Sequence, residues 1–432
     1  MLPIRRKNLA RMTTATTGAG TITLGSAVSG FNTFANAGVT DGDIVHYGIR
    51  DGANSEVGYG TYTASGTTLT RNVIESTNSD GAISLSGGAE VFLTALAEDF
   101  LGPGFVGPQN FSIAVSAGSS ALTIALKGAN GSDPSASNPV IIPFRNATGT
   151  TGTPVYQIQR AALSLVISSG STMAVTSSTA FRIWVVIFDD GGTLRLGAIN
   201  CLSSALNIYP LQDDIIASST AEGGAGGADS AHVFYTGSAV TSKAYRILGY
   251  LEWNTSGVTA GTWTTSNLSK VQLFGPGVKL PGDVVQIQRL DDGVDATNNP
   301  STVLPADNTI PQNTEGNQYL SQAITPTSAA NLLNISSQIN VTTAQADGNW
   351  FSMSLFQDST ANALISTATR AGRVISNNAY IMAISHRIRA GTSSSTTFKI
   401  RAGGETTDTV IFNNGLFADT VNSYLEIIER MS

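Results

Sequence analysis

The sequence predicts an all-β chain made of several sandwich-type or jelly-roll-like domains. Large apolar residues alternate with small ones at a period of two in residues 111–115, 122–126 and 351–355, as in a strand that buries one face. Turn-forming pairs such as Asp51-Gly52 and Asp190-Gly191 separate these runs and supply the positive φ angles that tight hairpins need. The 3.6-residue period of a helix is almost absent.

The composition fits this class and excludes others. Charged residues make up only 12 % of the 432 residues, hydrophobic ones make up 41 %, and the formal net charge is −7. Disorder requires low hydrophobicity together with a high net charge, so the chain is expected to fold. Its longest apolar run, residues 183–188, is far shorter than the ~18 residues of a membrane-spanning helix. A single cysteine, Cys201, excludes internal disulfides, so stability must come from burial.

Clusters of Pro and Gly predict where the domains end. At roughly 150 residues per domain the length favours about three domains. Such clusters occur at residues 102–108 and again between 275 and 305, where strand patterns stop. We therefore expect an N-terminal β module at 1–101, a central β-sandwich at 102–282, a linker at 283–305 and a C-terminal β-sandwich at 306–432.

The N-terminus carries a basic cluster. Arg5, Arg6, Lys7 and Arg11 occur within twelve residues that contain no acid. On a flexible arm these side chains either remain solvated or dock on an acidic or polar surface of a larger assembly. The segment that follows is not apolar enough for a secretory signal. The rest of the chain is net acidic, so no nucleic-acid partner is expected.

In the central unit, residues 181–188 are apolar on both faces apart from Arg182. A strand of this kind must be covered on both sides, either at the centre of a sheet or at a subunit contact. Trp253 and Trp263 flank a loop of Ser, Thr and Gly, where they either stack on a sugar or pack in the core, and we favour the core.

The C-terminal unit is the first choice for contact with a ligand. Polar segments at 390–397 and 403–408 lie between probable strands, and loops on a rigid scaffold are where binding residues concentrate. Arg387, Arg389 and Arg401 either contact acidic sugars or solvate an outer face.

No catalytic residue, metal site or cofactor site is predicted. The three histidines lie far apart and lack the spacing of metal ligands; they are His46, His232 and His386. Three acid pairs that glycoside hydrolysis might use all adjoin turns or strand ends, where Asp is favoured for its bonds to the backbone; they are Asp189-Asp190, Asp213-Asp214 and Asp291-Asp292. Asp41-Gly42-Asp43 lacks the further ligands of a calcium loop.

Several segments resemble proteins of tailed bacteriophages. The N-terminal unit, residues 1 to about 101, is similar to a small β module of phage structural proteins, through residues 11–24, 30–34, 41–43, 47–49, 58–62, 69–71 and 91–93. The C-terminal unit is similar to terminal β-sandwich domains of phage fibres, through residues 310–316, 355–359, 386–387 and 397–401. Residues 271–277 are more weakly similar to the same proteins.

This resemblance implies a tail or head fibre or spike of the virion, assembled in the bacterial host cytoplasm. Its N-terminal module would dock on tail, portal-vertex or capsid proteins, and its distal domains would contact a host cell-surface glycan, usually as a homotrimer. The alternatives are a capsid decoration protein without receptor binding and, less favoured, a fibre-borne polysaccharide hydrolase. No catalytic residue is carried over from the resemblance.

Overall fold

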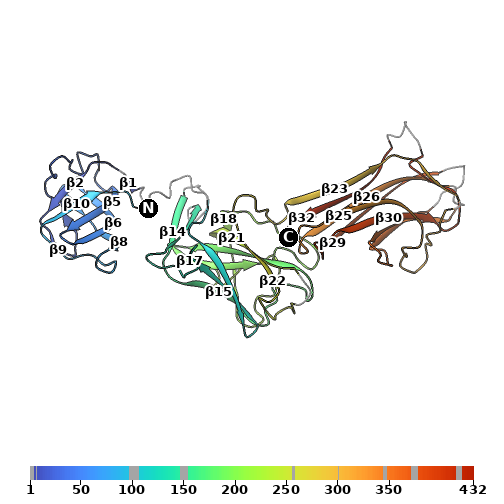
Figure 1. Cartoon of the computed structure of the whole chain (residues 1–432), viewed down its shortest axis with the longest axis horizontal. Coiled ribbons are helices and arrows are strands. Elements are labelled where there is room, and N and C mark those ends of the chain that lie inside the picture. Colours follow the sequence, from blue (N-terminus) through green and yellow to red (C-terminus); the bar gives the residue numbers. More distant parts are fainter. Residues whose placement is uncertain are drawn as a thin grey trace. The chain divides into compact units, whose positions relative to one another are not determined.

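The computed structural model describes residues 4–5, 7–96, 107–145, 154–254, 258–299, 301–343, 348–370, 378–414 and 421–432. Apart from one turn of 3-10 helix, η1 (Ala64–Gly66), the regular structure of these residues is entirely β, so the predicted fold class is confirmed. The chain forms two compact units, Met1–Val106 and Gly107–Ser432, drawn in blue and from cyan to red in Figure 1.

The N-terminal unit is a strongly curled sheet. Its strands follow the order β2-β10-β5-β6-β7-β4, with β1 parallel to β5 and β8 beside β6, while β3 pairs with β9. Their bounds are β1 (Ile4–Arg5), β2 (Arg11–Thr14), β3 (Thr17–Gly18), β4 (Ile22–Thr23), β5 (Ile44–Asp51), β6 (Asn54–Thr63), β7 (Thr68–Leu69), β8 (Asn72–Ser76), β9 (Leu85–Ser86) and β10 (Ala89–Leu93). The predicted turn after Asp51 is a two-residue hairpin in which Gly52 has φ 59°.

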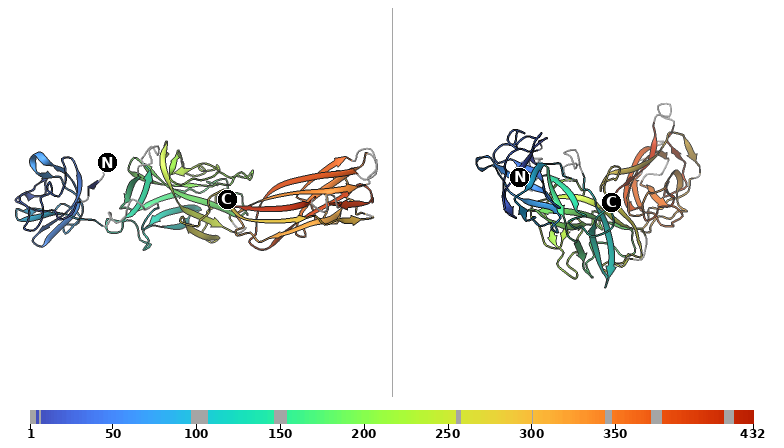
Figure 2. Two further views of the ribbon diagram at one scale, coloured as in Figure 1. Left: turned by 90° about the horizontal axis from the view of Figure 1, so that it is seen from above. Right: turned by 60° about the vertical axis from the view of Figure 1, so that its left-hand side comes forward.

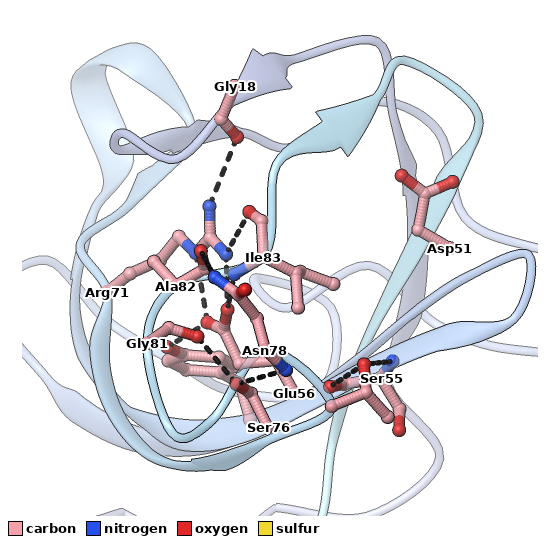
Figure 3. A network of polar contacts seen from close by, with 12 residues as sticks. Gly18, Asp51, Ser55, Glu56, Arg71, Ser76, Asn78, Gly81, Ala82 and Ile83 are labelled. Carbon is pink, nitrogen blue, oxygen red and sulfur yellow. Dashed lines mark hydrogen bonds and ion pairs between the residues drawn. The ribbon is translucent and has the colours of Figure 1, made fainter.

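A buried ion pair stabilises the interior of this unit (Figure 3). Glu56 on β6 binds Arg71 through both carboxylate oxygens, and the two side chains are 0 % and 2 % exposed. The carboxylate also accepts bonds from the Tyr47 hydroxyl at 2.8 Å and the Ile83 amide at 2.9 Å. Arg71 donates further to the carbonyls of Ile83 at 2.9 Å and Gly18 at 3.3 Å. Every oxygen of Glu56 thus has two partners, and burial raises the pKa of Tyr47.

The second unit begins with a sandwich around the sheet β18-β21-β16-β17-β20-β19, with β22 beside β21. Against it lie a sheet of β11, β12 and β15 and the hairpin of β13 and β14. Their bounds are β11 (Ser112–Gly118), β12 (Ala121–Lys127), β13 (Val140–Arg145), β14 (Pro154–Gln159), β15 (Leu163–Ile167), β16 (Phe181–Asp190), β17 (Thr193–Ile199), β18 (Ile215–Ala217), β19 (Thr220–Ala221), β20 (Tyr235–Thr236), β21 (Lys243–Trp253) and β22 (Leu268–Leu273).

Strand β16 explains the run that is apolar on both faces. Ile183 and Val185 point into one core, and Trp184 and Val186 point into a second core on the opposite face of the sheet. All four side chains are fully buried within a single chain. The run is therefore a central strand, and it offers no surface for a subunit contact.

The C-terminal sandwich packs two sheets around one core, and its long strands run side by side in Figure 2 (orange to red). One sheet has the order β23-β32-β26-β31-β24 with β29 beside β26, and the other has the order β25-β30-β27-β28. Their bounds are β23 (Val284–Asp292), β24 (Ala296–Asn298), β25 (Asn317–Ile324), β26 (Leu332–Thr343), β27 (Trp350–Gln357), β28 (Ile365–Arg370), β29 (Asn378–Arg389), β30 (Thr396–Gly404), β31 (Val410–Phe412) and β32 (Ser423–Arg430).

The linker expected at 283–305 is wrong. Strand β23 of this stretch pairs along its length with β32, and β24 pairs with β31. The abundance of Asp, Asn and Pro suggested a loop, whereas the alternation of residues 284–290 is that of an edge strand. The boundary expected after residue 101 falls outside the described residues, and the compact units divide after Val106.

The two sandwiches of the second unit share side chains where they meet. Val285 on β23 and Met431, directly after β32, pack in the same cluster as Trp184 of β16. The Trp184 indole donates to the Ser432 carbonyl at 3.0 Å, and Arg182 donates to the Ser432 hydroxyl at 2.9 Å. Residues 107–432 are accordingly one compact unit rather than two domains on a linker.

Candidate anchoring and glycan-contact surfaces

The basic cluster at the N-terminus is not a flexible arm. Arg5 belongs to β1, which pairs with β5, and Arg11 lies on β2, where it forms an ion pair with Glu90. The Arg11 guanidinium lies 5.5 Å from the ring centre of Phe31 and 5.8 Å from that of Phe92. The sequence shows the charges but not these pairings, because β1 is too short to show a period.

The other two residues of the basic cluster give less support to an anchoring surface. Lys7 is half-buried, and Arg6 lies outside the described residues. Of the four residues, Arg11 is the one whose surface contacts the structure describes.

Beside Arg11 lies an apolar surface that the sequence did not reveal. Leu9 is 67 % exposed and Phe31 is 38 % exposed, and the Leu9 carbonyl accepts the Asn32 amide at 2.8 Å, which brings the two segments together. Leu9 has φ 57°, a left-handed conformation that costs a residue with a β-carbon roughly 1–2 kcal/mol. Strained residues of this kind cluster at functional sites. We call Leu9, Phe31 and Arg11 the Leu9 surface.

Trp253 and Trp263 are not available to stack on a sugar. They are 0 % and 4 % exposed, and the Trp253 ring stacks on Phe181 at 4.8 Å. Their indole N–H groups donate to the carbonyls of Thr264 and Ser171 at 3.0 and 2.9 Å. The favoured interpretation, packing in the core, is confirmed and the glycan-contact alternative is wrong, because the pairing of β21 with β16 turns Trp253 inward.

Of the three arginines of the C-terminal unit, two are committed to backbone contacts. Arg389 is partly buried and donates to the Ala180 carbonyl at 3.3 Å, and burial lowers its pKa. Arg401 donates to the carbonyls of Glu315 and Gly316 at 2.7 and 2.6 Å, and burial lowers its pKa as well. Arg387 on β29 is exposed, and among the three it is the candidate that remains for ligand contact.

Arg387 stands on an outward face of the sheet that carries both polar and apolar side chains. Register aligns Ile287, Ile428, Asn334 and Arg387 in one row across β23, β32, β26 and β29. Ile381, on the same face, is 72 % exposed. We call the outward side chains of these four strands the β29 face.

The acid pairs are engaged in structural contacts. Asp189 accepts the Gly192 amide at 2.7 Å in a turn, and Asp190 binds Arg195 at 2.7 Å. Burial raises the pKa of Asp213, which Arg246 contacts at 2.9 Å. The remaining contacts follow the same pattern, Asp214 with Arg246, Asp291 with Arg289 and Asp292 with the Val294 amide.

The other titratable groups assemble no reactive constellation in the part of the chain that is described. Nε2 of His232 lies 3.0 Å from the Asn207 carbonyl, and desolvation lowers the pKa of His386. Cys201 is buried, which raises the pKa of its thiol, and a thiol is then a poor nucleophile. Across the described ranges, no three His, Cys, Asp or Glu side chains lie close enough together to hold a metal ion.

Helices of the length and apolarity needed to cross a membrane do not occur among the described residues.

No protein-family model matches the chain, and no curated protein matches it. The solved structure of the infectious bursal disease virus Gt strain is 8 % identical with a TM-score of 0.23, over 75 % of this chain and 78 % of that chain. The VP2 subviral particle of infectious bursal disease virus is 10 % identical with a TM-score of 0.21, again over 75 % and 78 %. Dimeric latent PorU from Porphyromonas gingivalis is 12 % identical with a TM-score of 0.18 over 61 % of this chain, which spans only 26 % of the PorU chain. Likenesses this low carry no argument about fold or function.

Proposed function

We propose that the chain is a non-enzymatic structural protein of a tailed-bacteriophage virion, a head or tail fibre or spike. Its N-terminal unit docks on other virion proteins, and its second unit contacts a host cell-surface glycan. The observation that carries the proposal is the division of the chain into a small module with its own core and buried ion pair and a larger second unit. A protein that docks through one unit and binds a receptor through the other needs two units that fold separately.

The Leu9 surface is the part of the N-terminal unit that best suits docking. It combines two exposed apolar side chains with a cation held between aromatic rings. Burial of apolar surface is the dominant favourable contribution to most protein–protein association, and a charge at the rim of an interface contributes more to specificity. Because Arg11 is already paired with Glu90, we expect only a modest dependence of docking on salt.

The β29 face is the part of the second unit that best suits host contact. Its central strand presents a ladder of amide and hydroxyl side chains beside the exposed Arg387, consisting of Asn334, Ser336, Gln338 and Asn340. Such groups match the hydroxyls and the acidic groups of a polysaccharide. Contact with a single sugar is weak, so the hold on a cell comes from avidity among several copies.

A homotrimer is the oligomeric state that we propose. The strand at 181–188 gives no support to this proposal, since both of its faces are covered within the chain. The proposal rests on the resemblance to phage fibres and on the need for avidity. Light scattering of the purified chain at micromolar concentration is expected to give three times the monomer mass of 44.7 kDa, and a monomer would contradict the proposal.

Adsorption tests the receptor-binding part of the proposal. Virions are mixed with host cells in the presence of the purified full-length chain, which is expected to compete for the receptor. If a folded chain in large excess leaves adsorption unchanged, the decoration alternative is favoured. If the chain shortens host capsular or lipopolysaccharide glycan, the hydrolase alternative is favoured.

A further inference from the structure

A hollow of about 260 Å³ lies where the two sandwiches of the second unit meet. The central sandwich contributes side chains of β16, β21 and β22 and of the loop after β22, including Tyr250 and Lys279. The C-terminal sandwich contributes Thr327, Ser328 and Met431. The hollow therefore exists only because the two sandwiches form one unit.

Strand register places a row of charges at this hollow. Arg182 on β16 stands directly opposite Glu252 on β21, and Glu252 stands directly opposite Lys270 on β22. Residues in register on neighbouring strands share one face of the sheet. The row therefore carries the charges plus, minus and plus across three adjacent strands, and all three residues line the hollow.

The Glu252 carboxylate of this row is already bonded to Arg182. Arg182 donates from Nε to Glu252 at 2.5 Å, and both side chains are buried. The remaining donors of Arg182 are directed to Asn331 and Ser432. Glu252 is the single acid that lines the hollow, and the buried Glu429 lies behind it, bonded to Thr327 and Asn331. With Arg182 and the two lysines, these side chains carry three positive and two negative charges, and within the described part of the chain neither carboxylate is bonded to a lysine.

Lys270 and Lys279 are both exposed, and neither forms an ion pair within the described ranges of the chain. Lys270 lies 5.9 Å from the ring centre of Tyr250. Three other lysines each bind an oxygen atom of an aspartate residue, namely Lys127, Lys243 and Lys399. A chain with only six lysines and a net charge of −7 thus places two unpaired cations around one hollow, which favours a negatively charged ligand.

We propose that this hollow binds the carboxylate of an acidic sugar residue, such as a hexuronate of a surface polysaccharide. The two lysines bind the carboxylate, since charge-assisted bonds are the stronger ones. Gln272 and Ser328 offer an amide and a hydroxyl group to the sugar hydroxyls, and Val278 and Met431 offer apolar contact to the ring. These neutral groups favour a sugar over a bare inorganic anion. The choice of polysaccharide as the source of the ligand rests on the proposed function.

Calorimetric titration of the full-length chain tests the proposal with three probes, sodium glucuronate, glucose and inorganic phosphate. Glucuronate is expected to bind weakly, as a single sugar does, and more tightly than the other two. The K270Q/K279Q double variant is expected to weaken glucuronate binding by about tenfold, from the loss of two exposed ion pairs. The K127Q variant, which removes a lysine outside the hollow, is the matched control and is expected to bind as the parent does.

The proposal is overturned if glucuronate binds no better than glucose, or if the folded double variant binds glucuronate like the parent. Equal affinity for phosphate, lost in the same double variant, would also overturn it, since the hollow would then be a general anion site. Failure in this titration leaves the virion assignment intact, because adsorption and incorporation into particles are measured separately. Conversely, glucuronate binding by a chain that is absent from virions would refute the proposed function alone.

Discussion

The buried ion pair of the N-terminal unit allows a quantitative prediction for the substitution Glu56→Gln. Glutamine keeps one acceptor oxygen but places an NH2 group where Oε2 now accepts bonds from Arg71 and from the Ile83 amide. Donors then face donors, and the Arg71 charge remains buried without a counter-charge. Removing one partner of a buried pair costs about 3–5 kcal/mol. At about 4–8 °C per kcal/mol for a domain of this size, the Tm of the N-terminal unit is expected to fall by at least ~12 °C.

Differential scanning calorimetry of the full-length chain measures this shift. The two compact units are expected to unfold in separate transitions, and only the transition of the N-terminal unit is expected to move. Glu75→Gln, on an exposed carboxylate of β8, is the matched control and is expected to shift Tm by little. If Glu56→Gln behaves like this control, the ion pair does not stabilise the unit as argued.

A double variant of the N-terminal unit and a single variant of the C-terminal sandwich give two further predictions. Replacing Leu9 and Phe31 with Asp removes two exposed apolar contacts worth about 1.5–3 kcal/mol each when buried, so incorporation into virions is expected to fall at least about tenfold. The unit is expected to stay folded, because Asp tolerates the left-handed conformation of Leu9. Ile310→Asp in the second unit is the control, and copy numbers on purified particles equal to those of the parent would disprove the docking surface. Desolvation holds the pKa of His386 below its ordinary value of 6.5, so the unfolded chain takes up the proton first as the pH falls. The contribution of the neutral His386 to the free energy of unfolding is therefore fully present above pH 6.5 and decreases as the pH falls from 6.5 towards the lower pKa of the folded state. Denaturant unfolding of the His386→Asn variant is expected to lack this part of the pH dependence. An unchanged pH dependence would contradict the assignment.

Local patterns in the sequence predicted the local structure well. The alternation at 111–115 and 122–126 corresponds to strands β11 and β12. The pairs Asp51-Gly52 and Asp190-Gly191 both lie at two-residue hairpin turns. The run at 181–188 was correctly expected to be covered on both faces. Strand alternation and hairpin turns depend on residues that are adjacent in the chain, so they can be predicted from one sequence.

What the sequence did not show depends on long-range register. Arg182, Glu252 and Lys270 are far apart in the chain, and only the pairing of three strands aligns them. The same is true of Leu9 and Phe31, which a single bridge between their neighbours brings together. The sequence surroundings of the tryptophan pair favoured the core but also suited stacking on a sugar, and only the pairing of β21 with β16 decides between them.

The central claim is that the N-terminal unit attaches the chain to the virion. It is tested most directly by counting copies of the chain on particles from a phage that encodes it without residues 1–106. We expect the shortened chain to be soluble in the lysate and absent from purified virions, while the full-length chain is present. Incorporation of the shortened chain at the normal copy number would contradict the claim.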